Sequence, residues 1–93
     1  MLQINEHHEG RVKSIGFETA TLPATVGVME PGQYRFETRR AETIHVISGN
    51  MQVRIGADAQ WQVYDEGDRF DVPANSHFEV SLEQQTAYLC LYR

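Results

Sequence analysis

Short stretches in which apolar and polar residues alternate recur along this chain, and Gly, Pro, Asn or Asp separates many of them. The two clearest stretches are residues 32–38 and residues 42–48, which a polar corner joins. A β-strand with one face inward and the other in water produces this period of two. No window of helical length has apolar residues at positions i, i+3, i+4 and i+7. The pattern therefore predicts an all-β chain.

Turn residues divide the rest of the chain into further strands, which we predict at residues 11–17, 22–29, 51–55, 61–64, 69–73, 77–82 and 86–92. Pro23 restricts the second of these to a sheet edge or to a strand start. About eight to ten short strands in succession are typical of a small β-sandwich or barrel. A chain of 93 residues has room for one modest core, so we predict a single domain over residues 1–93.

Composition argues against several classes of function. The formal net charge of −5 is unlike that of a protein that binds nucleic acid through its phosphates. No apolar run is long enough to cross a bilayer, and residues 1–9 lack the basic start and apolar middle of a signal peptide. We therefore expect a cytoplasmic protein that engages no membrane. The single cysteine, Cys90, excludes an internal disulfide and is predicted to be a small buried hydrophobic residue.

Glu42 is the residue of the central stretch that most needs an explanation. It shares a strand face with Ile44 and Val46, and a carboxylate on an apolar face is costly to desolvate unless it is paired or used. Aromatic residues at inward positions, among them Phe36 and Phe78, are explained one by one as core residues. Around an acid, however, such residues also build the apolar wall of a pocket.

The histidines do not follow a metal-binding pattern. A metal site needs three or four donors that converge on one point. His45 lies on the opposite strand face from Glu42, His77 faces away from Phe78, and the other two histidines belong to the least regular part of the chain. We therefore predict no metal site. The glycine-containing motifs that bind phosphate or present a nucleophilic serine are also absent from the sequence.

The only local basic cluster consists of Arg35, Arg39 and Arg40, which Glu37 interrupts and Glu42 follows. Such a cluster can meet one anion, although a solvated strand end is the more ordinary explanation.

The spacing of glycine, glutamate and proline resembles the two signature motifs of the cupin barrel. Six residues separate Glu42 from Gly49, and five separate Gly67 from Pro73. The cupin pattern places His-x-His before the glutamate and a further histidine after the proline. In this chain those positions hold Phe36, Thr38 and Phe78, and Asn75 replaces a glycine that the pattern expects. The resemblance implies a single-domain cupin barrel that has lost its metal.

The chain is more closely similar to one family of small cupins, the pyrimidine/purine nucleoside phosphorylases. The resemblance covers essentially the whole chain and includes residues 1–3, 12–17, 46–49, 61–64 and 88–90. It implies phosphorolysis of many purine and pyrimidine nucleosides, with free base and α-ribose 1-phosphate as products. The expected partners are then small-molecule nucleosides and inorganic phosphate, the latter as a co-substrate, and no cofactor is expected.

The chemistry of that reaction assigns expected roles to individual residues. We expect Glu42 to accept hydrogen bonds from the ribose hydroxyls, or to protonate the leaving base if its pKa is raised. Thr38 is also expected to be catalytic, as a neutral donor to the phosphate. Base stacking is expected at an aromatic set, and phosphate binding at a basic set. The aromatic set is Tyr34, Phe36 and Phe78, and the basic set is Lys13, Arg40 and Arg54.

Two other functions remain open at this point. A non-catalytic cupin that binds a nucleoside or a sugar would need the same pocket with one acid. A metal-dependent cupin oxygenase would use Glu42 with histidines, and the missing His-x-His argues against it. We also expect a homodimer, because small cupins that resemble this chain commonly pair. Leu2 and Ile4 alternate with polar residues, so residues 1–5 are expected to add a strand to a sheet edge and to help form the contact.

Overall fold

The computed structural model describes residues 2–58 and 60–93. These residues form ten β-strands and no helix, which confirms the all-β prediction. No helix of the described residues could therefore cross a membrane. The strands are β1 Gln3–His7, β2 Val12–Glu18, β3 Pro23–Met29, β4 Gly32–Thr38, β5 Glu42–Ser48, β6 Asn50–Ile55, β7 Gln62–Asp65, β8 Arg69–Val72, β9 Ser76–Leu82 and β10 Thr86–Tyr92.

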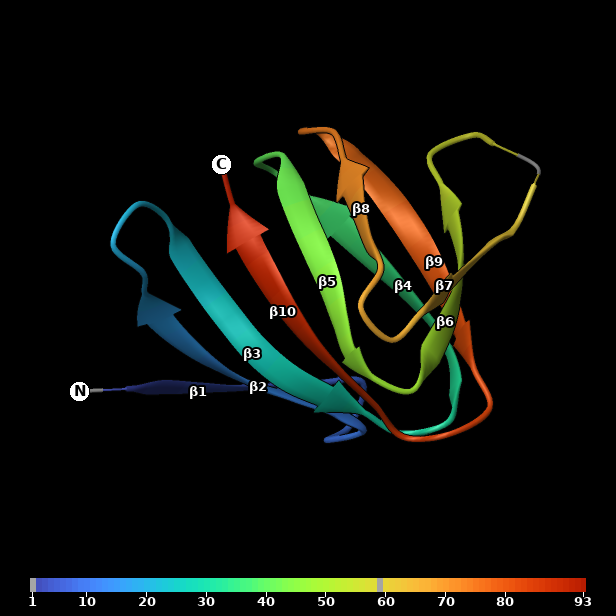
Figure 1. Cartoon of the computed structure of the whole chain (residues 1–93), viewed down its shortest axis with the longest axis horizontal. Helices are drawn as coiled ribbons and strands as arrows, with labels where there is room; N and C mark the ends of the chain where they lie inside the picture. Colours follow the sequence, from blue (N-terminus) through green and yellow to red (C-terminus); the bar gives the residue numbers. More distant parts are fainter. Residues whose placement is uncertain (1, 59) are drawn as a thin grey trace.

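Two antiparallel sheets pack face to face (Figure 1). The larger sheet has six strands in the order β1-β2-β3-β10-β5-β8, and the smaller has four in the order β4-β9-β6-β7. In Figure 1 the blue and cyan strands β1, β2 and β3 extend to the left, beyond the smaller sheet. The inner faces of both sheets supply the core, in which Val12, Met51, Val53, Val72 and Val80 are at most 1% exposed.

The strands that the alternation predicts are the ones that enclose this core. All nine strands predicted from it are present, and each begins and ends within one residue of the prediction. Pro23 is the first residue of β3, which pairs with a strand on either side, so the strand-start alternative is the one realised. The tenth strand, β1, pairs with β2 and forms an edge of the larger sheet, as expected for the first residues of the chain.

The polar corner at residues 39–41 carries the chain from one sheet to the other. β4 belongs to the smaller sheet and β5 to the larger sheet, so the two strands of the central stretch face each other instead of pairing. Ile44 and Val46 of β5 are 3% and 2% exposed. Glu42 lies on the same inner face and is half-buried, as the alternation predicted.

The turn between β8 and β9 keeps a glycine-like conformation without a glycine. Asn75 has a φ of 54°, a left-handed conformation that asparagine adopts more readily than most residues. Thr38 fastens the end of β4 to this turn, because its Oγ1 donates to the Pro73 carbonyl at 2.8 Å and accepts from the Ser76 amide at 2.9 Å. The departure from the cupin glycine therefore leaves the local turn intact.

Candidate functional site

A cavity of about 360 Å³ opens between the two sheets. Its volume falls within the range of roughly 300–1,000 Å³ that is usual for small-molecule sites. The larger sheet contributes a mostly polar wall and the smaller sheet an aromatic one, and the 39–41 corner reaches the cavity as well. The lining residues are His7, Ser14, Thr25, Met29, Phe36, Glu37, Arg39, Arg40, Glu42, Ile44, Phe78, Tyr88, Cys90 and Tyr92.

Glu42 is the half-buried acid of this cavity. It is the first residue of β5, where its backbone pairs with Val72 on one side and Tyr92 on the other. Burial raises the pKa of the Glu42 carboxyl above its ordinary value, and a hydrogen bond from the Cys90 thiol opposes that shift. The Cys90 Sγ donates to Glu42 Oε1 at 3.3 Å. Glu42 is thereby able to hold or release a proton nearer to neutral pH than an exposed glutamate can.

The inner face of β10 places further donors beside Glu42. Tyr88, Cys90 and Tyr92 alternate along the strand and all line the cavity. Burial raises the pKa of Tyr88 to about 12, and burial also raises the pKa of Cys90 and of Tyr92. All three side chains are therefore neutral hydrogen-bonding groups at neutral pH. The Tyr92 hydroxyl also shares a hydrogen bond of 3.1 Å with Thr25 Oγ1.

The opposite wall of the cavity is aromatic. Phe36 of β4 and Phe78 of β9 are directly paired across the smaller sheet, and their rings stack with centroids 5.3 Å apart and planes 30° apart. Tyr34 does not reach the cavity: it is 4% exposed, and its hydroxyl donates to the Glu30 carbonyl at 2.7 Å. Of the three predicted stacking residues, Phe36 and Phe78 thus line the same cavity as Glu42, and Tyr34 lies in the core.

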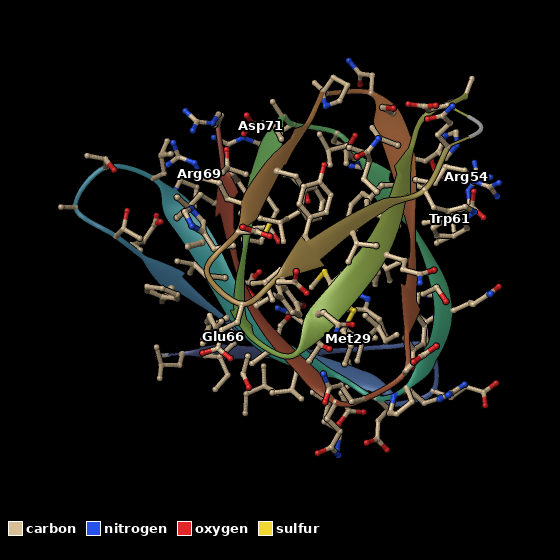
Figure 2. The ribbon with its side chains drawn as sticks, turned by 45° about the vertical axis from the view of Figure 1, so that its right-hand side comes forward. Met29, Arg54, Trp61, Glu66, Arg69 and Asp71 are labelled. Carbon is tan, nitrogen blue, oxygen red and sulfur yellow. The ribbon has the colours of Figure 1, made fainter. Side chains whose placement is uncertain are left out.

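Two of the three predicted phosphate-binding residues lie outside the cavity. Lys13 is exposed and meets Glu6 at 3.7 Å. Arg54 meets Glu79 at 3.0 Å, and its guanidinium lies 4.7 Å from the centre of the Trp61 ring. Figure 2 shows Arg54 and Trp61 together on the outside of the molecule. Arg40 alone of the predicted set lines the cavity, where the neighbouring Arg39 joins it.

Several lining residues were missed from the sequence. Tyr88, Cys90 and Tyr92 share one face of their predicted strand, so the alternation did indicate that all three point inward. Core packing was a sufficient explanation for inward side chains, and they were therefore not assigned to a site. His7 was placed in the least regular part of the chain, whereas it ends β1 and lines the cavity. Thr38, predicted to be catalytic, is 4% exposed and does not line the cavity, because the backbone of the β8–β9 turn occupies its hydroxyl.

Comparison with known proteins places the whole chain in one family. The family profile described as pyrimidine/purine nucleoside phosphorylase matches residues 2–92. A protein of that name from Hahella chejuensis is 52% identical over 99% of this chain and 99% of its own length. The chain belongs to the pyrimidine/purine nucleoside phosphorylase family.

Solved structures agree with the cupin fold of this phosphorylase family member. A Vibrio parahaemolyticus protein of unknown function superposes with a TM-score of 0.96 at 40% identity, over 100% of this chain and 99% of that one. A cupin from Shewanella frigidimarina superposes with a TM-score of 0.77 at 20% identity, over 98% of this chain and 82% of that one. The cupin fold predicted from the sequence is therefore confirmed.

Many cupins bind a metal ion, but the donor set of this phosphorylase family member does not fit one. Phe36 and Phe78, which stand where the cupin pattern expects histidines, carry no ligand atom, and Thr38 is engaged by backbone groups. Within residues 2–58 and 60–93, no three His, Cys, Asp or Glu side chains gather closely enough to hold a metal ion. Glu42 is the one residue of the expected ligand set that this chain retains.

Proposed function

We propose that this protein cleaves the N-glycosidic bond of purine and pyrimidine nucleosides with inorganic phosphate and without a metal ion. A phosphate oxygen bonds to C1′ of the ribose as the bond from C1′ to the base nitrogen breaks. The electron pair of that bond leaves with the base, which takes up a proton. The products are the free base and α-ribose 1-phosphate. The observation that carries this proposal is a half-buried acid facing an aromatic stack in one cavity, with arginines among the lining residues.

Glu42 is the group that the reaction needs most. The transition state of glycosidic cleavage resembles an oxocarbenium ion, in which positive charge develops on the ribose ring. An ionised Glu42 stabilises that charge and accepts hydrogen bonds from the ribose hydroxyls. A protonated Glu42 instead donates its proton to the leaving base. Burial raises the pKa of Glu42 above its ordinary value, which favours the protonated form relative to an exposed glutamate.

The aromatic wall suits a broad range of bases. Every base has a π-face, and stacking on an aromatic ring depends little on which base it is. Phe36 and Phe78 present two stacked rings to the cavity and donate no hydrogen bond from their side chains. A wall of this kind holds purines and pyrimidines without selecting one pattern of donors and acceptors.

A direct assay tests this function. The purified protein is incubated with uridine and with adenosine, with and without phosphate, and free base is measured by chromatography. We expect base to appear only with phosphate, and the rate to survive EDTA because the cavity lacks a metal-ligand set. Base released equally without phosphate would make the protein a hydrolase. Loss of activity in EDTA that one added metal restores would overturn the metal-independent reaction.

An absence of free base under every condition would favour a non-catalytic nucleoside-binding cupin. Isothermal titration of uridine and adenosine into the protein distinguishes that case from an inactive preparation, because a binding module retains micromolar or tighter affinity without turnover.

The outer face of the larger sheet supports the proposal of a homodimer. Ile4 of β1, Ile15 of β2, Val26 of β3 and Leu89 of β10 are paired in register and form an apolar row across four strands. Ile4 is 71% exposed and Ile15 is 37% exposed. Monomers rarely leave a continuous apolar patch of more than a few hundred Å² in water. A second copy of the same face, related by a two-fold axis, is the occupant that buries both rows at once.

We expect Ile15→Lys to convert a dimer into a monomer, because it places a charge in the middle of the apolar row. Light scattering coupled to size-exclusion chromatography measures the mass at micromolar concentration. Val63→Lys is the matched control, since Val63 is 60% exposed but belongs to β7 in the other sheet. A wild-type protein that runs as a monomer, or an Ile15→Lys variant that stays dimeric, would contradict this interface.

A further inference from the structure

We infer that Arg39 and Arg40, on the corner between β4 and β5, bind the phosphate that attacks the nucleoside. This inference rests on the proposed function and names the subsite that the predicted basic residues Lys13 and Arg54 do not supply. Phosphate offers several oxygen acceptors and carries up to two negative charges at neutral pH. Guanidinium groups match it well, because their planar N–H donors stay charged and bind oxygen pairs.

The corner that carries both arginines is held in place by the end of β10. The Arg93 amide donates to the Ala41 carbonyl at 2.9 Å. Arg40 Nε donates to the main-chain oxygen of Arg93 at 2.9 Å, and Arg40 Nη2 donates to the Tyr92 carbonyl at 3.5 Å. A guanidinium has five N–H donors, so these two bonds orient Arg40 and leave its other donors open to an anion.

No aspartate or glutamate side chain of the described residues is paired with Arg39 or Arg40. Neither takes part in any of the three ion pairs found among residues 2–58 and 60–93. Glu37 also lines the cavity, but it meets Arg35 at 3.2 Å. The cavity is thus lined by two guanidinium groups that no described aspartate or glutamate side chain pairs with, and positively charged groups of this kind attract an anion.

Four of the other cations are engaged elsewhere, and Arg69 does not line the cavity. Lys13 and Arg54 are paired with Glu6 and Glu79 on the outside of the molecule. The Arg11 guanidinium donates to the Pro31 carbonyl. Arg93 Nε donates to Thr43 Oγ1 at 2.9 Å. None of these side chains lines the cavity. Of the arginines and lysine in the part of the chain that the structure describes, Arg39 and Arg40 alone reach it.

The position of the two arginines also suits the reaction. They precede Glu42 by two and three residues on the same corner, so a phosphate bound there lies close to the acid. The base is held by the aromatic wall of Phe36 and Phe78, on the smaller sheet. A ribose at Glu42 would then have the phosphate and the base on different sides, which a displacement at C1′ requires. A phosphate dianion beside Glu42 also disfavours the ionised carboxylate and so favours a protonated, donating Glu42.

The test compares Arg39→Gln and Arg40→Gln with Arg35→Gln, whose side chain pairs with Glu37 and does not line the cavity. We expect each of the first two variants to raise the KM for inorganic phosphate about 10-fold or more. The dissociation constant for uridine, measured without phosphate, should change less than about 2-fold. Arg35→Gln should leave both constants unchanged. If Arg40→Gln fails to fold after losing its bonds to β10, Arg39→Gln carries the test, because no such bond involves Arg39.

A second measurement separates this inference from the proposed function. Titration of inorganic phosphate into the protein without nucleoside, followed by ³¹P NMR, reports binding whether or not the protein turns over. Cleavage that proceeds with an unchanged KM for phosphate in both variants would overturn the subsite and leave the function standing. Phosphate binding that Arg39→Gln abolishes, in a protein that cleaves no nucleoside, would uphold the anion site and overturn the function. Binding and cleavage both absent would overturn both.

Discussion

Replacing Glu42 with Gln should lower kcat/KM for nucleoside phosphorolysis by a factor of about 10²–10⁴, the usual contribution of a general acid or base. The amide keeps the shape of the side chain, and its oxygen still accepts the hydrogen bond that the Cys90 thiol donates at 3.3 Å. It carries neither a charge for the ribose cation nor an acidic proton for the base. The loss should therefore fall on kcat more than on the affinity for nucleoside.

The same substitution should leave the protein as stable as the wild type, or more stable. The ordinary pKa of the glutamate carboxyl is 4.5, and burial raises it in the folded protein. Between these two values the folded state binds more protons than the unfolded state, so the free energy of unfolding decreases as pH rises. Glutamine lacks this titration. The melting temperature of Glu42→Gln should thus gain on that of the wild type as pH rises above 4.5, and the difference should be smallest at lower pH.

Glu37→Gln is the matched control, because Glu37 lines the same cavity but is exposed and paired with Arg35. Its kcat/KM should stay within a few-fold of the wild-type value. If Glu42→Gln keeps full activity per folded molecule while its melting temperature drops, then Glu42 is a structural residue. The pH profile of the wild type separates the two catalytic roles: a rate that falls as Glu42 ionises identifies the acid, and a rate that rises identifies the carboxylate.

Local alternation was sufficient to predict the strands and the inward face of Glu42. The period of two needs only neighbouring residues, and it predicted both β4 and β5 within the central stretch. The alternation does not predict which distant segments of the chain pair with each other. The hydroxyl of Thr38 is engaged by a turn 35 residues away, which the alternation could not indicate. The Cys90 thiol likewise donates to a carboxylate 48 residues away, a contact that the alternation could not indicate.

The choice of face also limited what the sequence could predict. Leu2, just before β1, and Ile4 of β1 are 65% and 71% exposed, whereas the polar His7 of the same strand lines the cavity. The usual rule of apolar residues inside is reversed there, so His7 was missed. Arg54 follows the buried Val53, so the alternation along the strand already predicted that the Arg54 side chain points outward. Its assignment as a phosphate ligand rested on charge alone. Arg39 and Arg40 lie on a corner between the sheets, where the alternation of a strand does not predict which way a side chain points.

The second large effect concerns Gly27 of β3, because Gly27→Ala should destabilise the protein by about 2–3 kcal/mol. Gly27 lies on the inner face of β3, between β2 and β10. A Cβ at this position would lie 2.7 Å from the Lys13 carbonyl oxygen and 2.7 Å from the Tyr88 hydroxyl. Ordinary contacts of a Cβ begin at about 3.4 Å, so the strands must separate or the ring of Tyr88 must leave its place.

The backbone contact makes this cost hard to avoid. Tyr88 can move toward the cavity that it lines, but the Lys13 carbonyl is fixed in the β2–β3 pairing. The double variant Gly27→Ala with Tyr88→Leu should therefore recover only part of the lost stability. Any folded Gly27→Ala protein should also bind uridine more weakly, because the displaced ring fills part of the cavity.

Gly16→Ala is the matched control for Gly27→Ala, since it makes the same change in the neighbouring strand β2. A Cβ at Gly16 would have no atom nearer than 3.8 Å. Its stability should stay within about 1 kcal/mol of the wild type, because alanine also reduces the freedom of the unfolded chain. Thermal unfolding should show Gly27→Ala melting roughly 10–20 °C below Gly16→Ala. Equal melting temperatures for the two variants would mean that the strands around Tyr88 can separate at little cost in stability. That result would contradict a closely packed wall of the cavity beside Glu42.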